Sequence, residues 1–211
     1  MGKINHAGFS VAGAGRAVLT FLALASAAPM AAAEALVGQA PPAFAAHDSQ
    51  GKEISLAAYA GKTVVLEWTN PECPYVKKHY STKNMQRLQQ EARDAGVVWL
   101  TLTSAAPGQN GYVNELEAGA WIEQQQAKPT AFLHDAKGHI ANAYGVKLAL
   151  HMFVVDPKGT LAYSGAIDDK PTSNPRDVSG AKNYVREALS VLAAGQAVQP
   201  SSTRPYGCFA R

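Results

Sequence analysis

Two cysteines, Cys73 and Cys208, are the only thiols in this chain of 211 residues. Cys73 follows a run of apolar and β-branched residues, 63–69, which predicts a strand buried on both faces. It precedes a stretch from residue 75 to about 95 that predicts a helix. Unpaired backbone N–H groups and the helix dipole favour a thiolate at the N-terminus of a helix. The sequence therefore predicts a reactive thiol at Cys73, with a small, buried and inert cysteine as the alternative.

The residues around Cys73 bear on its reactivity. Pro74 suits the first position of the helix, because the N–H that proline lacks would have no partner there. Lys77, within about one turn, adds positive potential near the thiol, whereas the negative charge of Glu72 disfavours the thiolate. Pro74 and Lys77 are therefore predicted to support a thiolate at Cys73.

The elements that position Cys73 alternate between strand and helix. Strands are predicted at 63–69, 97–103, 130–134, 151–156 and 160–165, and helices at 75 to about 95, 113–126, 140–144 and 180–194. Alternating elements predict a parallel-type sheet with helices on both faces, and the tight turn at 157–159 adds an antiparallel hairpin. We therefore expect an α/β fold with a central mixed sheet flanked by helices on both faces.

The first 33 residues have the three-part pattern of a secretory signal peptide. Lys3 and Arg16 form a positive region without acids, an apolar run begins at residue 17, and three alanines at 31–33 form a small-residue cleavage site. The apolar run is shorter than the roughly 20 residues that span a bilayer. The sequence thus predicts an exported protein, periplasmic or extracellular, with one domain at 34–211.

Charge and hydropathy exclude two classes of partner. The formal net charge of +3 falls to +1 when residues 1–33 are removed, because Lys3 and Arg16 are the only charged residues in that segment. No cluster of Lys and Arg with interleaved aromatic residues is present, so no nucleic-acid partner is predicted. No later segment is long and apolar enough to span a membrane, so no stable membrane insertion is expected after signal cleavage.

Several motifs are spread over residues 36–209. They are VGQAPPAF at 37–44, ECPYVKKHY at 72–80, NMQ at 84–86, SAAPG at 104–108, YGV at 144–146, HMFVVDPKG at 151–159, GAIDD at 165–169 and YGC at 206–208. Together they resemble the peroxiredoxin-like branch of the thioredoxin superfamily, whose members are described as redoxin or AhpC/TSA-like proteins. The resemblance implies a thioredoxin-like fold and a thiol-dependent oxidoreductase.

The chain departs from the better-known relatives at three places. Val76 stands where a Cys-x-x-Cys motif has its second cysteine, and Leu66 and Asn70 replace the Pro and Thr of the peroxiredoxin pattern, with Thr69 displaced by one position. Leu150 replaces the cis-proline of thioredoxins and the peroxide-polarising arginine of peroxiredoxins. Since losing one such donor costs other enzymes about 10²–10³ in rate, peroxide reduction is expected to be slow. The peptide bond before Leu150 is expected to be trans, because a cis bond costs about 2.5–4 kcal/mol without proline.

Cys208 has three possible roles. It is a resolving cysteine that attacks an oxidised Cys73, or a structural staple that ties the tail to the body, or a free thiol on a frayed tail. The resemblance favours the first role, because a terminal Gly-Cys recurs in this branch.

Three further groups of side chains could take part in chemistry. His151 begins the strand next to the loop that faces the thiol in this fold, where it could tune Cys73 near neutral pH. Convergence of Cys73, Cys208 and His151 would instead form a site for Cu(I) or Zn(II). Asp135 and the acids at 168–169 are expected in solvated turns, with a hard-cation site as the alternative.

These observations give one leading hypothesis and two alternatives. The first is an exported thiol oxidoreductase of the peroxiredoxin-like type, with Cys73 as the nucleophile and Cys208 as the resolving cysteine. It needs no cofactor and takes electrons from an external thiol reductant or a redox partner protein. The alternatives are a binding or metallochaperone module that uses Cys73, Cys208 and His151, and a redox-inactive scaffold with a structural disulfide.

Overall fold

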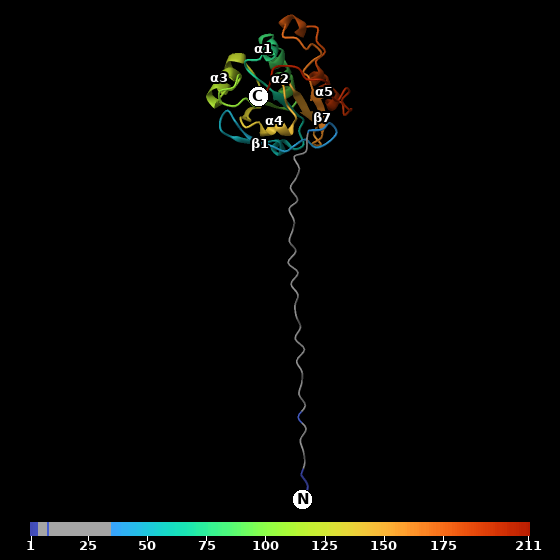
Figure 1. The fold of residues 1–211 in the computed structure, drawn as a ribbon. Helices are drawn as coiled ribbons and strands as arrows, with labels where there is room; N and C mark the ends of the chain where they lie inside the picture. Colours follow the sequence, from blue (N-terminus) through green and yellow to red (C-terminus); the bar gives the residue numbers. More distant parts are fainter. Residues whose placement is uncertain (4–7, 9–34) are drawn as a thin grey trace. The chain divides into compact units, whose positions relative to one another are not determined.

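A seven-stranded mixed sheet forms the centre of the fold in the computed structural model, which describes residues 1–3, 8 and 35–211 (Figure 1). In sequence order the strands are β1 (Ala45–Asp48), β2 (Glu53–Ser55), β3 (Val64–Trp68), β4 (Val98–Thr103), β5 (Ala131–His134), β6 (Met152–Val155) and β7 (Leu161–Gly165). Across the sheet the order is β2-β1-β5-β4-β3-β6-β7. The central strands β3, β4 and β5 run parallel, and the remaining neighbours pair antiparallel.

Helices cover both faces of this sheet. The α-helices are α1 (Pro74–Ser81), α2 (Asn84–Asp94), α3 (Glu115–Gln125), α4 (His139–Ala143) and α5 (Tyr184–Ala193), and 3₁₀ turns lie at Leu56–Tyr59 and Pro175–Val178. Side chains from α1, α2 and α5 pack with Cys73 against one face of the sheet. Side chains from α4 pack against the other face. The predicted α/β fold with a mixed sheet between helices is confirmed.

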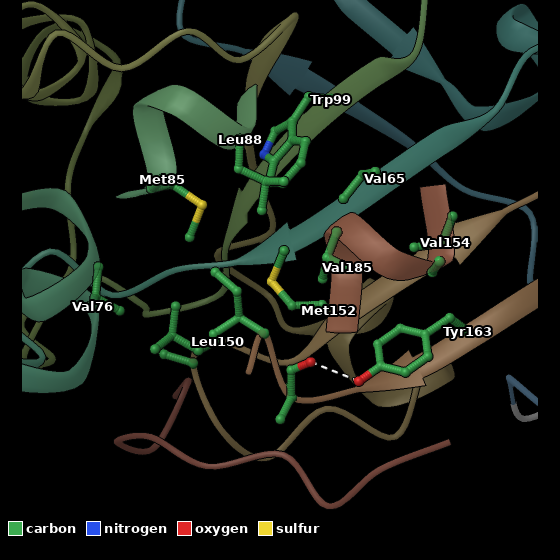
Figure 2. Packing of buried hydrophobic residues seen from close by; sticks show 14 of the residues in the cluster. Val65, Val76, Met85, Leu88, Trp99, Leu150, Met152, Val154, Tyr163 and Val185 are labelled. Atoms are coloured by element: carbon green, nitrogen blue, oxygen red, sulfur yellow. Dashed lines mark hydrogen bonds between the residues drawn. The ribbon is translucent and has the colours of Figure 1, made fainter. Parts of the chain in front are cut away.

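Strand β3 divides the core because all five of its residues are buried. Successive side chains of a strand point to opposite faces. Val65 therefore joins the cluster that contains Cys73, whereas Leu66 and Trp68 join the opposite cluster. Figure 2 shows the cluster on the Cys73 side, where Val65 and Trp99 of the sheet lie with Met85 and Leu88 of α2. The apolar run that predicted this strand reflects burial on both faces.

The helix predicted from residue 75 to about 95 is two helices, so this prediction was wrong. Lys83 adopts a left-handed conformation, with φ of 59°, between α1 and α2. The Thr82 hydroxyl donates to the carbonyl of Lys78 at 2.9 Å. Such a local bond competes with helix continuation. Because of this break α2 is a separate helix, and the Asn84 side chain at its beginning lies 2.9 Å from Nδ1 of His79.

Strand β1 was not predicted. Its sequence, Ala45–Asp48, contains no β-branched or aromatic residue, so it carries little intrinsic strand signal. It forms nonetheless because it pairs with β2 on one side and β5 on the other. Tertiary pairing, rather than local propensity, produces this strand.

The predicted signal peptide, residues 1–33, lies outside the described residues apart from residues 1–3 and 8. Within the described part of the chain, no helix combines the length and apolar character needed to cross a membrane.

The C-terminal segment, residues 198–211, is here called the tail. It runs back along the sheet edge, where Ser202 forms a parallel bridge with Ser164 of β7. The Thr203 hydroxyl accepts a hydrogen bond from the backbone N–H of Ala166 at 3.0 Å and contacts the hydroxyl of Tyr163. Phe209 then forms an antiparallel bridge with Leu148. The tail is thus fastened to the body at several points before and after Cys208.

Candidate active site

Cys73 lies between β3 and α1, at the N-cap of the helix, and Pro74 is the first helical residue. This placement confirms the predicted position of both residues. The Asn70 side-chain oxygen accepts the backbone N–H of Glu72 at 2.9 Å, which fixes the turn before the helix. Cys73 is only 1% exposed, so its sulfur lies beneath other parts of the chain.

The partner of Cys73 is Cys208, and the two sulfurs form a disulfide with a Cα–Cα distance of 5.7 Å. Cys208 is partly exposed, in contrast to Cys73. The backbone N–H of Cys208 also donates to the sulfur of Cys73 at 3.2 Å. No cysteine is free in this structure, so the role of Cys208 as a free thiol is ruled out.

The backbone of the tail holds Cys208 against the loop before β6. The carbonyl of Cys208 accepts from the N–H of Ala149 at 2.8 Å, and the N–H of Ala210 donates to the carbonyl of Lys147 at 3.0 Å. Gly207 has a φ of 145°, and a Cβ at this position would lie 2.2 Å from the carbonyl oxygen of Ala149. A glycine before Cys208 is therefore required for the close approach of the tail.

Leu150 shapes the loop that receives the tail. Its preceding peptide bond is trans, as expected, but its backbone is left-handed with φ of 62°. Its N–H donates to the carbonyl of Trp68 at 2.6 Å, and its side chain is fully buried. Figure 2 shows this side chain within the same apolar cluster as Cys73. A buried leucine thus fills the place where relatives were expected to carry proline or arginine.

Asn70 is a site residue that the sequence did not single out as functional. Its side-chain amide donates to the carbonyls of Asn110, at 3.2 Å, and of Phe209, at 3.4 Å. Gly111 permits this packing, because a Cβ there would fall 2.0 Å from the Asn70 side-chain oxygen. Asn70 therefore joins the turn before Cys73 to the residue after Cys208. The signal available in the sequence was only its position directly after the strand.

Two residues close to Cys73 in the sequence, Lys77 and Thr69, were further candidates to support its chemistry. Lys77 forms an exposed ion pair with Glu72 at 2.9 Å, so the two charges largely offset each other near the thiol. Thr69 is buried, and its hydroxyl has no hydrogen-bond partner within the described residues.

His151 points away from the disulfide. Its ring stacks on Phe153 at 4.2 Å between centroids and shares a hydrogen bond with the Ser164 hydroxyl at 3.1 Å. Burial lowers the pKa of His151 to about 4, so the ring is neutral at pH 7. Since Phe153 belongs to the cluster on the opposite face of the sheet, the structure does not bring His151 to Cys73.

The alternative metal site gains no support from this arrangement. Both sulfurs are bonded to each other, and the imidazole of His151 is held by Ser164. Over residues 1–3, 8 and 35–211, no group of three or more His, Cys, Asp or Glu side chains is placed to hold a metal ion.

Of the three acids expected in solvated turns, Asp169 is exposed, whereas Asp135 and Asp168 are buried, so the expectation was wrong for these two. Asp135 accepts hydrogen bonds from the Ser104 hydroxyl at 2.8 Å and from the N–H of Ala141 at 2.8 Å, at the beginning of α4. Asp168 is 2% exposed and accepts the hydroxyl of Tyr206 in the tail. Protein donors face Asp135 and one oxygen of Asp168, which accounts for the burial of both side chains.

Glu67 is a further buried carboxyl group on β3. Four side chains donate to it: Tyr80 at 2.9 Å, Gln89 at 3.2 Å, Trp99 at 2.8 Å and Thr101 at 2.9 Å. Burial raises the pKa of Glu67 above its usual value, and the four hydrogen bonds oppose that rise. This cluster ties β3 to α1, α2 and β4 just before the strand reaches Cys73.

Comparison with known proteins places these features in a family. The model of the AhpC/TSA family matches residues 37–164, more than half of the chain. The chain belongs to the AhpC/TSA family. The family assignment confirms the resemblance found in the sequence motifs. A comparison with curated proteins found no match.

Solved structures share the fold at low sequence identity. An uncharacterized conserved protein from Geobacillus kaustophilus has a TM-score of 0.73 at 21% identity, covering 84% of this chain and 92% of that one. A hypothetical protein from Sinorhizobium meliloti has a TM-score of 0.69 at 19% identity, covering 82% and 93%. The thioredoxin domain of a thiol-disulfide oxidoreductase from Bacteroides vulgatus has a TM-score of 0.51 at 18% identity, covering 69% and 96%. These similarities confirm the thioredoxin-like fold.

Proposed function

We propose that the protein is an exported thiol–disulfide oxidoreductase of the peroxiredoxin-like type, in which Cys73 and Cys208 form the redox couple. The observation that carries this proposal is the disulfide between a cysteine at the N-terminus of α1 and a cysteine in the tail. Membership of the AhpC/TSA family and a fold shared with a thiol-disulfide oxidoreductase support it.

In the reducing half of the reaction, the reductant attacks the more exposed of the two sulfurs. Cys73 is 1% exposed and Cys208 is partly exposed, so a thiolate of the reductant attacks the sulfur of Cys208. The Cys73–Cys208 bond breaks, a mixed disulfide forms on Cys208, and Cys73 leaves as a thiolate. A second thiolate of the reductant then displaces Cys208, which yields the dithiol protein and the oxidised reductant. A stabilised thiolate is a faster leaving group, and the Cys208 N–H at 3.2 Å stabilises the sulfur of Cys73.

In the oxidising half, the Cys73 thiolate is the nucleophile and Cys208 resolves the product. Attack on a substrate disulfide releases one substrate thiol and leaves the other in a mixed disulfide on Cys73, and Cys208 then displaces this second thiol. Attack on a peroxide gives a sulfenic acid and an alcohol or water, and Cys208 then forms the disulfide with loss of water. Peroxide reduction is slow, because the apolar Leu150 and the Lys77–Glu72 ion pair offer no free cation to polarise the peroxide.

The proposal places the reaction outside the cytoplasm. A signal peptide at residues 1–33 exports the chain, and residues 34–211 form the mature thioredoxin-like domain with its Cys208-containing tail. The electron donor is an external thiol reductant or a redox partner protein. The N-terminal residue of the protein recovered after export tests this part: Glu34 is expected, and an intact Met1 would contradict it.

The second candidate function is a redox-inactive scaffold in which the disulfide is structural. The multiple contacts of the tail favour it, because Asn70, Ala149 and Lys147 hold residues 208–210 independently of the two sulfurs. The two candidates differ in whether the disulfide exchanges with thiols while the protein is folded.

A stoichiometric exchange experiment tests the proposal. The dithiol protein is mixed with oxidised glutathione, and products are identified by mass spectrometry for wild type, Cys208→Ser and Cys73→Ser. Wild type is expected to form its disulfide and release two glutathione thiols per protein, whereas Cys208→Ser accumulates a glutathione adduct on Cys73. The double variant Cys73→Ser/Cys208→Ser is the control and should remain unmodified. A wild-type dithiol that stays unreactive while folded would overturn the proposal in favour of the scaffold.

A further inference from the structure

The hydroxyl of Tyr206, two residues before Cys208, lies at the centre of a buried polar network. It lies 3.3 Å from the Lys78 ammonium and 3.2 Å from Nε2 of His79, and it donates to the carboxylate of Asp168. A phenol hydroxyl offers one donor and two acceptor sites. The three neighbours therefore satisfy this hydroxyl completely.

The proton on His79 can be assigned from its other partner. The side-chain amide of Asn84 lies 2.9 Å from Nδ1 and donates to it, so Nε2 carries the hydrogen and donates to Tyr206. Burial, together with the neighbouring Lys78 charge, lowers the pKa of His79 to about 3. The ring is therefore neutral at pH 7, and the charged members of the network are Lys78 and Asp168.

The side chains of Lys78 and Asp168 are both buried. Lys78 is 1% exposed and donates to the carbonyl of Lys170 at 2.8 Å, and its ammonium lies 5.1 Å from the centroid of the Tyr206 ring. Asp168 is 2% exposed, and one of its oxygens accepts the N–H of Lys170 at 3.0 Å. Its other oxygen has no hydrogen bond within the described residues and lies 3.8 Å from Nε2 of His79. Buried charges are costly when a partner is lost, so both groups depend on the Tyr206 hydroxyl.

The network connects the two elements that carry the sulfurs. Lys78 and His79 lie on α1, which begins directly after Cys73, and Tyr206 lies in the tail just before Cys208. The Tyr206 ring also packs on Tyr75 of the same helix, at 5.8 Å between centroids. None of these contacts involves the disulfide, so all of them remain possible in the dithiol protein.

We propose that Tyr206 is a positioning residue for thiol–disulfide exchange, whose hydroxyl keeps the tail docked on α1 after the disulfide is reduced. This inference rests on the function proposed above, since it concerns the same two cysteines. With the tail docked, Cys208 stays beside Cys73, and the buried Cys73 thiol remains covered between one oxidation and the next. Once a substrate disulfide or a peroxide has oxidised Cys73, the docked Cys208 thiolate displaces the substrate thiol or water from Cys73 and re-forms the disulfide, with no search by a free tail.

The covering of Cys73 can be measured without turnover. In a Cys208→Ser background no disulfide forms, and the rate of Cys73 alkylation by iodoacetamide, followed by mass spectrometry, reports whether the tail is docked. Hydrogen bonds to charged groups contribute about 1.5–3 kcal/mol, which corresponds to roughly a 10- to 100-fold change in an equilibrium. Adding Tyr206→Phe is therefore expected to raise the alkylation rate at least about tenfold.

Two further variants make the result specific to the hydroxyl. Tyr75→Phe is the matched control, because it removes a neighbouring hydroxyl and keeps the ring that packs on Tyr206, and its rate should stay within about twofold. Asp168→Asn keeps an acceptor oxygen but loses the charge, and should raise the rate about three- to tenfold. It decides the outcome if circular dichroism shows that Tyr206→Phe is unfolded. The proposal is overturned if the folded variants at residues 206 and 168 alkylate at the rate of the Tyr75→Phe control.

The disulfide equilibrium gives a second readout in the protein with both cysteines. Measured against glutathione, the constant for forming the Cys73–Cys208 disulfide should fall at least about tenfold in Tyr206→Phe and remain unchanged in Tyr75→Phe. An unchanged constant in Tyr206→Phe would also overturn the proposal. If instead the wild-type disulfide never exchanges while folded, the proposed function fails, and the alkylation experiment still tests the docking of the tail by itself.

Discussion

Leu150 gives a quantitative test of the loop that receives the tail. It is a buried, non-glycine residue with a left-handed backbone, φ of 62°, and its N–H bonds to the carbonyl of Trp68. We predict that Leu150→Gly is about as stable as Leu150→Ala, whereas glycine ordinarily destabilises a folded position relative to alanine by about 0.5–1 kcal/mol, and by more where the Cβ is buried.

The expected result follows from three terms. A left-handed conformation costs a residue with a Cβ roughly 1–2 kcal/mol, and glycine avoids this cost. Glycine gives the unfolded chain more freedom, which favours alanine by about 0.4–1 kcal/mol. Both variants lose the leucine side chain beyond Cβ, and this cost of about 2.7–5 kcal/mol cancels in the comparison. Only Leu150→Gly also loses the buried Cβ, which favours alanine by about 0.8 kcal/mol more, so the terms nearly balance and the two variants should have similar stability.

Urea unfolding of the oxidised variants measures this difference. With slopes of about 1–3 kcal/mol per molar, Leu150→Gly and Leu150→Ala should unfold within a few tenths of a molar of each other. Leu150→Pro should be less stable than either, because proline cannot adopt this φ and would leave the carbonyl of Trp68 without its donor. If alanine is the more stable of the pair by about 1.5 kcal/mol or more, Leu150 is not left-handed and the described geometry of the loop is wrong.

Three other substitutions test the rest of the site. For His151→Gln, the folded pKa of about 4 lies below the usual 6.5, so the unfolded wild type binds more protons between these values and stability is lost as pH falls from 6.5 towards 4. Between pH 7.5 and pH 4.5, the free energy of unfolding of His151→Gln, measured with urea, should fall by up to about 3 kcal/mol less than that of the wild type. An unchanged pH dependence would refute the neutral buried ring. Asn70→Ala removes the bonds to Glu72, Asn110 and Phe209 and should lower the free energy of unfolding by about 1–3 kcal/mol, whereas no loss would show that these bonds are not formed. Gly207→Ala places a Cβ against the carbonyl of Ala149 and should cost about 1–3 kcal/mol in thermal unfolding, and a neutral result would place the tail elsewhere.

Much of the sheet was predictable because burial on both faces leaves a local signal. The runs around β3 and β4 are apolar and β-branched, and the position of Cys73 at the start of a helix followed from them. Strand β1 and the break at Lys83 left no such signal, since pairing with distant strands and a left-handed residue produce them.

The contacts of the site were harder to predict because they join residues far apart in the chain. Two cysteines allowed a disulfide but also a free tail, and nothing local indicated that Tyr206 would meet Lys78, which lies 128 positions earlier. The orientation of His151 did have a signal. Residues i and i+2 of a strand share a face, so His151 follows Phe153, whereas Met152 faces the Cys73 cluster.

The kinetic order of disulfide reduction tests the central claim most directly. The folded wild-type protein is treated with increasing concentrations of dithiothreitol, and the appearance of free Cys73 and Cys208 is compared with the rate of global unfolding. If the disulfide is a redox couple, its reduction rate should rise in proportion to the dithiothreitol concentration and exceed the unfolding rate. A reduction rate that equals the unfolding rate and does not depend on dithiothreitol would contradict the claim and identify the disulfide as structural.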